Sequence, residues 1–130
     1  MRIAKRRSGS GNWKTVNDAL YEYPAEIIRV IDGDTVEARI DLGFHTFAVQ
    51  KLRLLGINAP EKRGASRESG LESASHLETL IASDQPIRVQ TRKDKQGKYG
   101  RYLATLLGGS GVNINQRMVY HGYAVSVEDR

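Results

Sequence analysis

The chain has no cysteine and no long apolar run. The lack of cysteine excludes disulfide bonds and thiolate metal sites, and it suits a reducing compartment. No stretch approaches the about 20 consecutive apolar residues that a membrane-spanning helix needs, so we expect no contact with a membrane. The basic N-terminus is not followed by an apolar segment, which argues against a secretory signal. We therefore expect a cytoplasmic location, with a processed secreted form as the alternative.

Several familiar catalytic patterns are also missing. The histidines His45, His76 and His121 are widely spaced and do not form a zinc motif, so we interpret them as structural or surface residues. Neither a nucleophile elbow nor a phosphate-binding loop is present. These absences argue against zinc enzymes, serine hydrolases and nucleotide-binding enzymes of the phosphate-loop type.

The charge of the chain is unevenly distributed. The 130 residues include 20 Lys and Arg and 15 Asp and Glu, for a formal net charge of +5. Residues 1–14 carry basic side chains and no acidic one, and residues 15–130 are balanced. We predict a basic N-terminal arm, residues 1–20, and a single domain, residues 21–130. The arm could attract nucleic acid through counterion release or be a solvated tail, and the sequence leaves both open.

Hydrophobic patterning predicts an α+β fold that is mainly β. Alternation predicts strands at residues 25–31 and 35–42, and a long third strand at 45–57 with a bulge or strong bend near Lys51. A capping box with Ser69 as N-cap begins a helix that ends near Ala82. Strands at 87–91 and 99–107 and a helix at 113–121 follow. Three strands, a helix, two strands and a helix predict a small five-stranded barrel of the OB-fold type with two helices.

The turn Asp32-Gly33-Asp34 lies between the first two predicted strands. Asp-Gly flanked by β-branched residues is a strong signal for an ordinary hairpin. Two neighbouring carboxylates repel each other, however, and a divalent cation such as Ca²⁺ would compensate them, because hard cations bind carboxylate and carbonyl oxygens. The turn alone therefore favours a hairpin and allows a metal site.

Three other charged residues stand near the ends of predicted strands. Arg53 lies among leucines on a strand suited to burial, so it needs an anionic partner, either a protein carboxylate or a phosphate. Glu61 follows Pro60 just past that strand, and Arg101 follows Gly100, which permits close approach of a ligand. Each also has a structural interpretation: an ion pair for Arg53, a solvated loop acid for Glu61 and a strand-edge charge for Arg101.

Four motifs in a fixed order resemble a known family. They are Ile31-Asp32-Gly33-Asp34-Thr35, Arg53 to Glu61 (RLLGINAPE), Lys98-Tyr99-Gly100-Arg101, and Asn115 with Gly122-Tyr123-Ala124. From about residue 25 to 125 the chain resembles the staphylococcal (micrococcal) nuclease, or thermonuclease-like, family. The resemblance implies a calcium-dependent endonuclease that hydrolyses phosphodiester bonds of DNA and/or RNA with little sequence specificity and leaves 3′-phosphate products. We expect a monomer that uses one Ca²⁺ ion, with Mg²⁺ or Mn²⁺ as alternatives.

The resemblance also implies a metal site. Asp34 and Asn58 match metal ligands, Ala59 matches the position that contributes its backbone carbonyl, and Asp32 matches an acid near the metal that acts through water. The best-known member of the family has aspartate where this chain has Asn58. The amide keeps an oxygen but loses a negative charge, so we expect weaker calcium binding.

The remaining matches concern the substrate. Arg53 and Arg101 match the two arginines that bind the scissile phosphate, and Glu61 matches the glutamate that activates or orients water. Lys98 and Tyr99 match residues that contact a terminal phosphate of the bound nucleotide. Guanidinium groups suit this work because hydrolysis builds negative charge on the phosphate oxygens.

One rival hypothesis belongs to a different functional class. Barrels of this kind also bind nucleic acid without cleaving it, through basic grooves and stacked aromatic side chains. The presence of Asp34, Arg53, Glu61 and Arg101 together favours the enzyme, and Asn58 favours a catalytically weak or inactive binding module.

Overall fold

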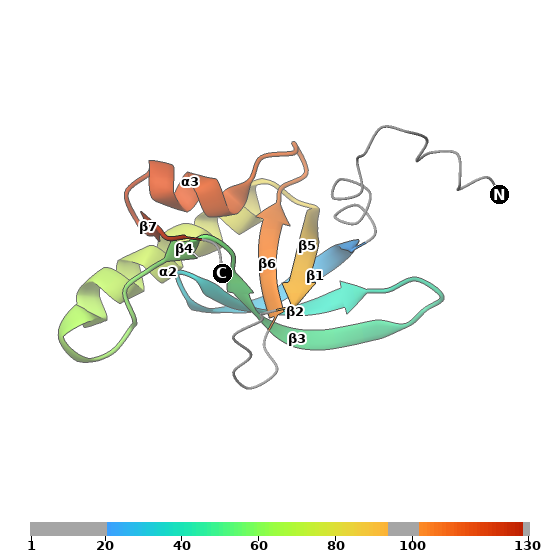
Figure 1. The fold of residues 1–130 in the computed structure, drawn as a ribbon, viewed down its shortest axis with the longest axis horizontal. Coiled ribbons are helices and arrows are strands. Elements are labelled where there is room, and N and C mark those ends of the chain that lie inside the picture. Colours follow the sequence, from blue (N-terminus) through green and yellow to red (C-terminus); the bar gives the residue numbers. More distant parts are fainter. Residues whose placement is uncertain (1–20, 94–101, 129–130) are drawn as a thin grey trace.

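The computed structural model describes residues 21–93 and 102–128 (Figure 1). The predicted N-terminal arm and the predicted site residues Lys98, Tyr99 and Arg101 lie outside these described residues. The elements, in chain order, are β1 (Glu22–Asp32), β2 (Thr35–Asp41), β3 (Phe47–Leu54), β4 (Ile57–Asn58), the 3-10 turn η2 (Gly64–Ser66), α2 (Arg67–Ser83), β5 (Ile87–Lys93), β6 (Tyr102–Leu107), α3 (Ile114–Tyr120) and β7 (Val125–Ser126).

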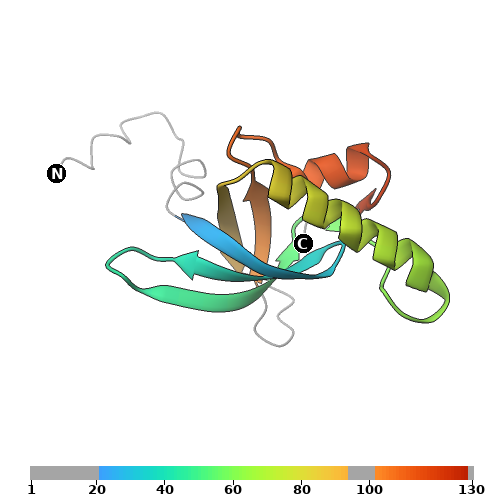
Figure 2. The same ribbon diagram turned by 180° about the vertical axis from the view of Figure 1, so that it is seen from behind.

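Five strands close into a barrel in the order β1-β2-β3-β6-β5. The pairing is antiparallel throughout, except that β3 and β6 run parallel, and β4 pairs with β7 in a separate two-stranded sheet. Figure 2 shows α2 running along one side of the barrel, with α3 beside it. This arrangement confirms the predicted fold class. None of the described helices is both long and apolar enough to cross a membrane.

Of the bulge or strong bend predicted near Lys51, the bulge is absent. The pairing of β3 with β2 is uninterrupted from Phe47 to Arg53. Leu52 and Leu54 are buried in the barrel, whereas Phe47 is exposed on the outer side of the same strand. The apolar residues of this segment do not alternate regularly because some of them, such as Phe47, are exposed on the outer face of the strand and do not belong to the core. The predicted long strand is instead divided after Leu54 by a turn, in which Gly56 has a φ of +80°.

The irregular pairing lies in β1. Its register with β2 shifts between Ile27 and Arg29 and again between Val30 and Asp32. The second shift comes directly before the Asp-Gly-Asp turn. Bulges bend a strand and redirect the side chains that follow, so the second shift alters how the chain enters the turn.

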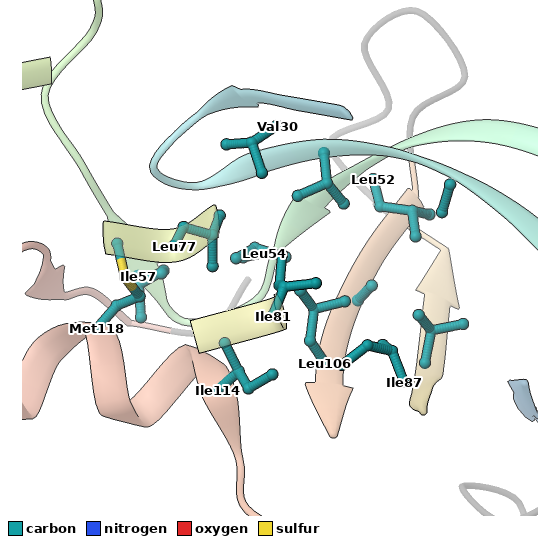
Figure 3. Packing of buried hydrophobic residues seen from close by; sticks show 14 of the residues in the cluster. Val30, Leu52, Leu54, Ile57, Leu77, Ile81, Ile87, Leu106, Ile114 and Met118 are labelled. Carbon is teal, nitrogen blue, oxygen red and sulfur yellow. The ribbon is translucent and has the colours of Figure 1, made fainter. Parts of the chain in front are cut away.

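The core fills the space between the barrel and the two helices. Figure 3 shows the buried side chains of α2 and α3 packing onto those of the strands. Full burial of one such aliphatic side chain stabilises the fold by about 1.5–3 kcal/mol. The labelled core residues are Val30, Leu52, Leu54, Ile57, Leu77, Ile81, Ile87, Leu106, Ile114 and Met118.

A buried asparagine ties α3 to the barrel. Asn115 is 3% exposed, and its Nδ2 donates to the carbonyl oxygens of Leu55 and Ala104, both at 3.0 Å. Its Oδ1 accepts from the backbone N–H of Leu106 at 3.0 Å. These bonds satisfy main-chain groups that would otherwise be buried without partners, and they hold α3 against β6 and the turn that follows β3.

Candidate functional site

Asp34 lies at the centre of the candidate site, in the turn between β1 and β2. The residue is only 7% exposed. Its Oδ2 accepts from the backbone N–H of Ala59 at 2.8 Å, and its Oδ1 accepts from Oγ1 of Thr35 at 2.9 Å. Its carbonyl oxygen accepts from the backbone N–H of Leu54 at 2.8 Å. A buried carboxylate needs such donors to offset the loss of hydration, and these bonds fix both its position and its orientation.

Arg53 supplies the opposite charge. It pairs with Thr35 in the register of β3 with β2. Because its neighbours Leu52 and Leu54 point into the barrel, its own side chain projects from the outer face of β3. Its Nη1 lies 2.9 Å from Oδ2 of Asp34. Nη1 also donates to the carbonyl oxygen of Ile57 at 3.2 Å, and Nη2 donates to Oδ1 of Asn58 at 3.0 Å. Of the two partners that the sequence left open for Arg53, the structure contains the carboxylate.

This one guanidinium gathers the oxygen atoms of the site. Its Nη1 contacts Oδ2 of Asp34, and its Nη2 donates to Oδ1 of Asn58, so the same planar group binds both oxygens. In the described part of the chain, no acceptor is found for Nε of Arg53. Arginine has five N–H donors, and Nε and Nη2 form one of the forks that match a phosphate. Arg53 can therefore keep its contact with Asp34 and still present donors to an anion.

The carboxylate of Asp32 contacts the loop backbone next to Glu61. Oδ1 of Asp32 accepts from the backbone N–H of Lys62 at 3.3 Å. Glu61 is exposed, and within residues 21–93 and 102–128 its carboxylate forms no hydrogen bond or ion pair. Its carbonyl oxygen, by contrast, accepts from Oγ of Ser66 at 2.8 Å. The loop after β4 is thus fastened beside the turn while the acid group of Glu61 faces solvent.

Gly33 explains how the turn comes so close to the rest of the site. A Cβ added at Gly33 would lie 2.7 Å from Cβ of Ser73 and 2.9 Å from Cβ of Ala59. Only glycine fits this space. Ser73 is itself buried, and its Oγ donates to the carbonyl oxygen of Tyr123 at 2.7 Å. Ser73 could not be predicted as a neighbour of the turn, because a serine within a helix carries no signal of its own in the sequence.

The oxygen donors of the site suit a hard cation. No cluster of three or more His, Cys, Asp or Glu side chains exists in the described ranges. The donors that do converge are the carboxylate of Asp34 and the amide oxygen of Asn58, and the backbone of Ala59 is hydrogen-bonded to the same carboxylate. Carboxylate, amide and carbonyl oxygens are the ligands of Ca²⁺. The side-chain oxygens of Asp34 and Asn58 are of the types that such an ion accepts, and in this structure both are bonded to the guanidinium of Arg53.

The structure therefore brings four predicted residues into direct contact, Asp34, Arg53, Asn58 and Ala59. Asp32 and the backbone around Glu61 lie beside them.

A second cluster lies between α2 and the end of α3. Nε2 of His76 and Nδ1 of His121 are 2.8 Å apart, and the ring of His76 stacks on Tyr123 with ring centroids 4.1 Å apart. Burial of His76 lowers its pKa below 6.5, and the nearby charge of His121 lowers the pKa further. This cluster agrees with the interpretation of these histidines as structural or surface residues.

Comparison with known proteins places these observations in a family. Residues 51–130 match the family described as "Staphylococcal nuclease homologue". The chain is 29% identical over 111 residues to "Endonuclease YhcR" of Bacillus subtilis (strain 168), which covers 79% of this chain and 9% of that protein. It is 32% identical over 98 residues to an "Uncharacterized endonuclease" of Escherichia coli O157:H7, covering 75% of this chain and 57% of that protein.

A further relative carries a name of another kind. The chain is 31% identical over 103 residues to "Succinoglycan biosynthesis protein ExoI" of Rhizobium meliloti (strain 1021), which covers 74% of this chain and 48% of that protein. The chain thus spans between about a tenth and somewhat more than half of these relatives. The family match itself extends over more than half of the chain, and it includes Arg53, Asn58, Ala59 and Glu61. This chain belongs to the staphylococcal nuclease homologue family.

Proposed function

We propose that this chain is a calcium-dependent nuclease that hydrolyses phosphodiester bonds of DNA and/or RNA with little sequence specificity. The observation that carries the proposal is the contact of Arg53 with both Asp34 and Asn58, next to the loop that carries the exposed Glu61. Membership of the family and the two relatives named endonucleases support it. We expect the chain to act as a monomer.

Asp34, Asn58 and Ala59 are the residues that would hold the metal, the last through its carbonyl oxygen, with Asp32 acting through water. A bound Ca²⁺ would supply positive charge for the phosphate and orientation for water, and Mg²⁺ or Mn²⁺ are alternatives. Asn58 contributes an oxygen without a charge, so we expect modest affinity for calcium.

Arg53 would bind the scissile phosphate through Nε and Nη2 while its Nη1 keeps the contact with Asp34. Arg101 is proposed as the second arginine on this phosphate, and Lys98 and Tyr99 as contacts to a terminal phosphate. Charged donors placed around the phosphorus stabilise the negative charge that grows on its oxygens as water attacks.

Glu61 would take the proton of the attacking water, or orient that water. In the proposed reaction the water oxygen bonds to phosphorus, and the bond between phosphorus and the 5′ oxygen breaks. The leaving 5′ oxygen gains a proton, and the phosphate stays on the 3′ oxygen. The products are therefore strands that end in a 3′-phosphate.

The test is cleavage of plasmid and single-stranded DNA and of RNA, with calcium or with a chelator, followed on a gel. We expect cleavage only with calcium. Arg53→Ala should lower turnover by about 100-fold or more, the usual loss when one charge-stabilising donor is removed, and Glu61→Gln should also abolish most activity. Cleavage that persists in the chelator would refute the dependence on calcium.

A binding module without catalysis is the second candidate, and one observation favours it. Asn58 brings no negative charge for a metal, and its side-chain oxygen already accepts a hydrogen bond from Nη2 of Arg53 at 3.0 Å. Binding of nucleic acid without cleavage in calcium, magnesium and manganese would support this alternative.

A further inference from the structure

The backbone at Glu61 is held from three directions. Oγ of Ser66 donates to the carbonyl oxygen of Glu61 at 2.8 Å. The next peptide N–H, that of Lys62, donates to Oδ1 of Asp32 at 3.3 Å. The third contact is with α2, at Gly70. A glutamate in a solvated loop does not require its backbone to be fixed by three contacts, so these contacts call for another explanation.

Gly70 lets the backbone of the loop lie directly on the helix. A Cβ added at Gly70 would lie 2.1 Å from the carbonyl oxygen of Glu61, 2.4 Å from its carbonyl carbon and 2.7 Å from the backbone nitrogen of Lys62. Glycine inside a helix costs about 1 kcal/mol relative to alanine. Gly70 is buried in the first half of α2, so close packing against Glu61 supplies a physical reason for that cost.

The side chain of Glu61 contrasts with its backbone. Within the part of the chain that the structure describes, no group pairs with its carboxylate, although its peptide unit is fixed by Ser66 and Gly70. A carboxylate that reaches solvent from a fixed backbone is suited to proton transfer, because the anchored peptide limits its distance from a bound substrate while its oxygens stay available.

We propose that Gly70 and Ser66 are positioning residues, which set the distance between the Glu61 carboxylate and the phosphate bound at Arg53. The inference rests on the proposed function, in which Glu61 activates or orients water. Neither residue touches the substrate. Both act through the peptide unit of Glu61.

The structure indicates how large the effect should be. An ordinary Cβ does not come within 3.0 Å of another heavy atom, and the one added at Gly70 would be 2.1 Å from the oxygen of Glu61. Alanine at this position must therefore displace the loop or the helix by roughly 1 Å, and a misplacement of that size can cost about 100-fold in rate. We expect a loss of that order in kcat, with KM changed by less than about twofold because Arg53 is untouched.

The experiment is a double-mutant cycle measured under single-turnover conditions with single-stranded DNA and calcium. The proteins are the unmodified chain, Gly70→Ala, Glu61→Gln and the double variant. Ser69→Ala serves as the matched control, because Ser69 is exposed in the same helical turn and this change also raises helix propensity. We expect Gly70→Ala to slow cleavage strongly in the unmodified chain and to have no further effect in the Glu61→Gln background.

Two outcomes overturn the inference alone, provided that Glu61→Gln is strongly impaired. One is that Gly70→Ala cleaves at nearly the unmodified rate. The other is that it slows both backgrounds equally, which indicates general structural damage. If Glu61→Gln cleaves as well as the unmodified chain, the proposed role of Glu61 fails and this inference fails with it.

Ser66 gives an independent test if Gly70→Ala does not fold. Ser66→Ala removes the hydrogen bond to Glu61 without adding an atom, and Ser66→Thr keeps the hydroxyl. We expect a several-fold lower kcat in Ser66→Ala, recovery in Ser66→Thr, and no effect of Ser66→Ala in the Glu61→Gln background. Equal losses in both backgrounds would refute the positioning role.

Discussion

Removal of Arg53 should lower the free energy of unfolding, because the buried carboxylate of Asp34 then lacks its positively charged partner. In Arg53→Ala the carboxylate of Asp34, which is 7% exposed, loses its ion-pair partner at 2.9 Å. Breaking a buried pair by removing one partner costs about 3–5 kcal/mol. Asp34 keeps its bonds from Ala59 and Thr35 and has some contact with solvent, so we expect the lower part of this range or slightly less, about 2–3 kcal/mol.

Calcium should recover part of this loss if Asp34 is a metal ligand. A cation that binds the folded chain raises its stability in proportion to the logarithm of its concentration above Kd. In Arg53→Ala the metal would no longer be repelled by the positive guanidinium that lies 2.9 Å from Oδ2 of Asp34. The variant should therefore gain more stability from calcium than the unmodified chain does.

The assay is urea unfolding in a chelator and at several calcium concentrations, followed by circular dichroism. The unmodified chain, Arg53→Ala, Asp34→Asn and the double variant are compared. We expect Arg53→Ala to respond to calcium and the double variant not to respond. Equal responses in both variants would refute the assignment of Asp34 as a ligand, and no response in any protein would refute a calcium site here. Neither result depends on cleavage.

Four further predictions follow from the same geometry. Gly33→Ala should destabilise the fold by about 1–3 kcal/mol in urea unfolding, because its Cβ would press on Ser73 and Ala59. Asn58→Asp should tighten calcium binding, measured by calorimetry, because it restores a charge to the ligand set. Leu77→Ala should cost about 2–5 kcal/mol by the same unfolding assay, because this side chain is fully buried. The pKa of His76 is lowered below 6.5 in the folded chain, so the unfolded chain binds more protons just below that pH; stability should fall as the pH drops below about 6.5, and His76→Gln should flatten the profile.

The barrel could be predicted from the sequence because local patterns and global packing agree in most elements. Val36, Ala38 and Ile40 alternate with polar residues along β2, and all three are buried. The end of α3 could also be predicted, because Gly122 follows the helix and has a φ of +84°, a conformation that favours glycine.

The errors came from features that local patterns do not encode. The helix predicted to begin at Ser69 starts at Arg67, and Ser66 before it uses its hydroxyl for Glu61 and Arg63 rather than for a cap. A serine followed three residues later by glutamate is typical of a capping box, but Ser69 and Glu72 both lie inside the helix.

The candidate site was predictable in its residue types and not in its contacts. The sequence predicted that Arg53 needs an anion, and it could not choose between a carboxylate and a phosphate. That choice depends on β4 and the Asp-Gly-Asp turn meeting at the end of β3, with Gly33 packed against Ser73. Contacts between residues so far apart in sequence leave no periodic pattern.

The parallel seam between β3 and β6 bears on how the protein is made. Arg53 pairs with Leu103 across this seam, so the two partners are separated by fifty positions of chain. Contacts of such long range carry a high loop-closure entropy and tend to form late in folding. During synthesis the ribosome must release β6 before the seam can close. We therefore expect Arg53 to reach its place beside Asp34 only after β6 has left the ribosome.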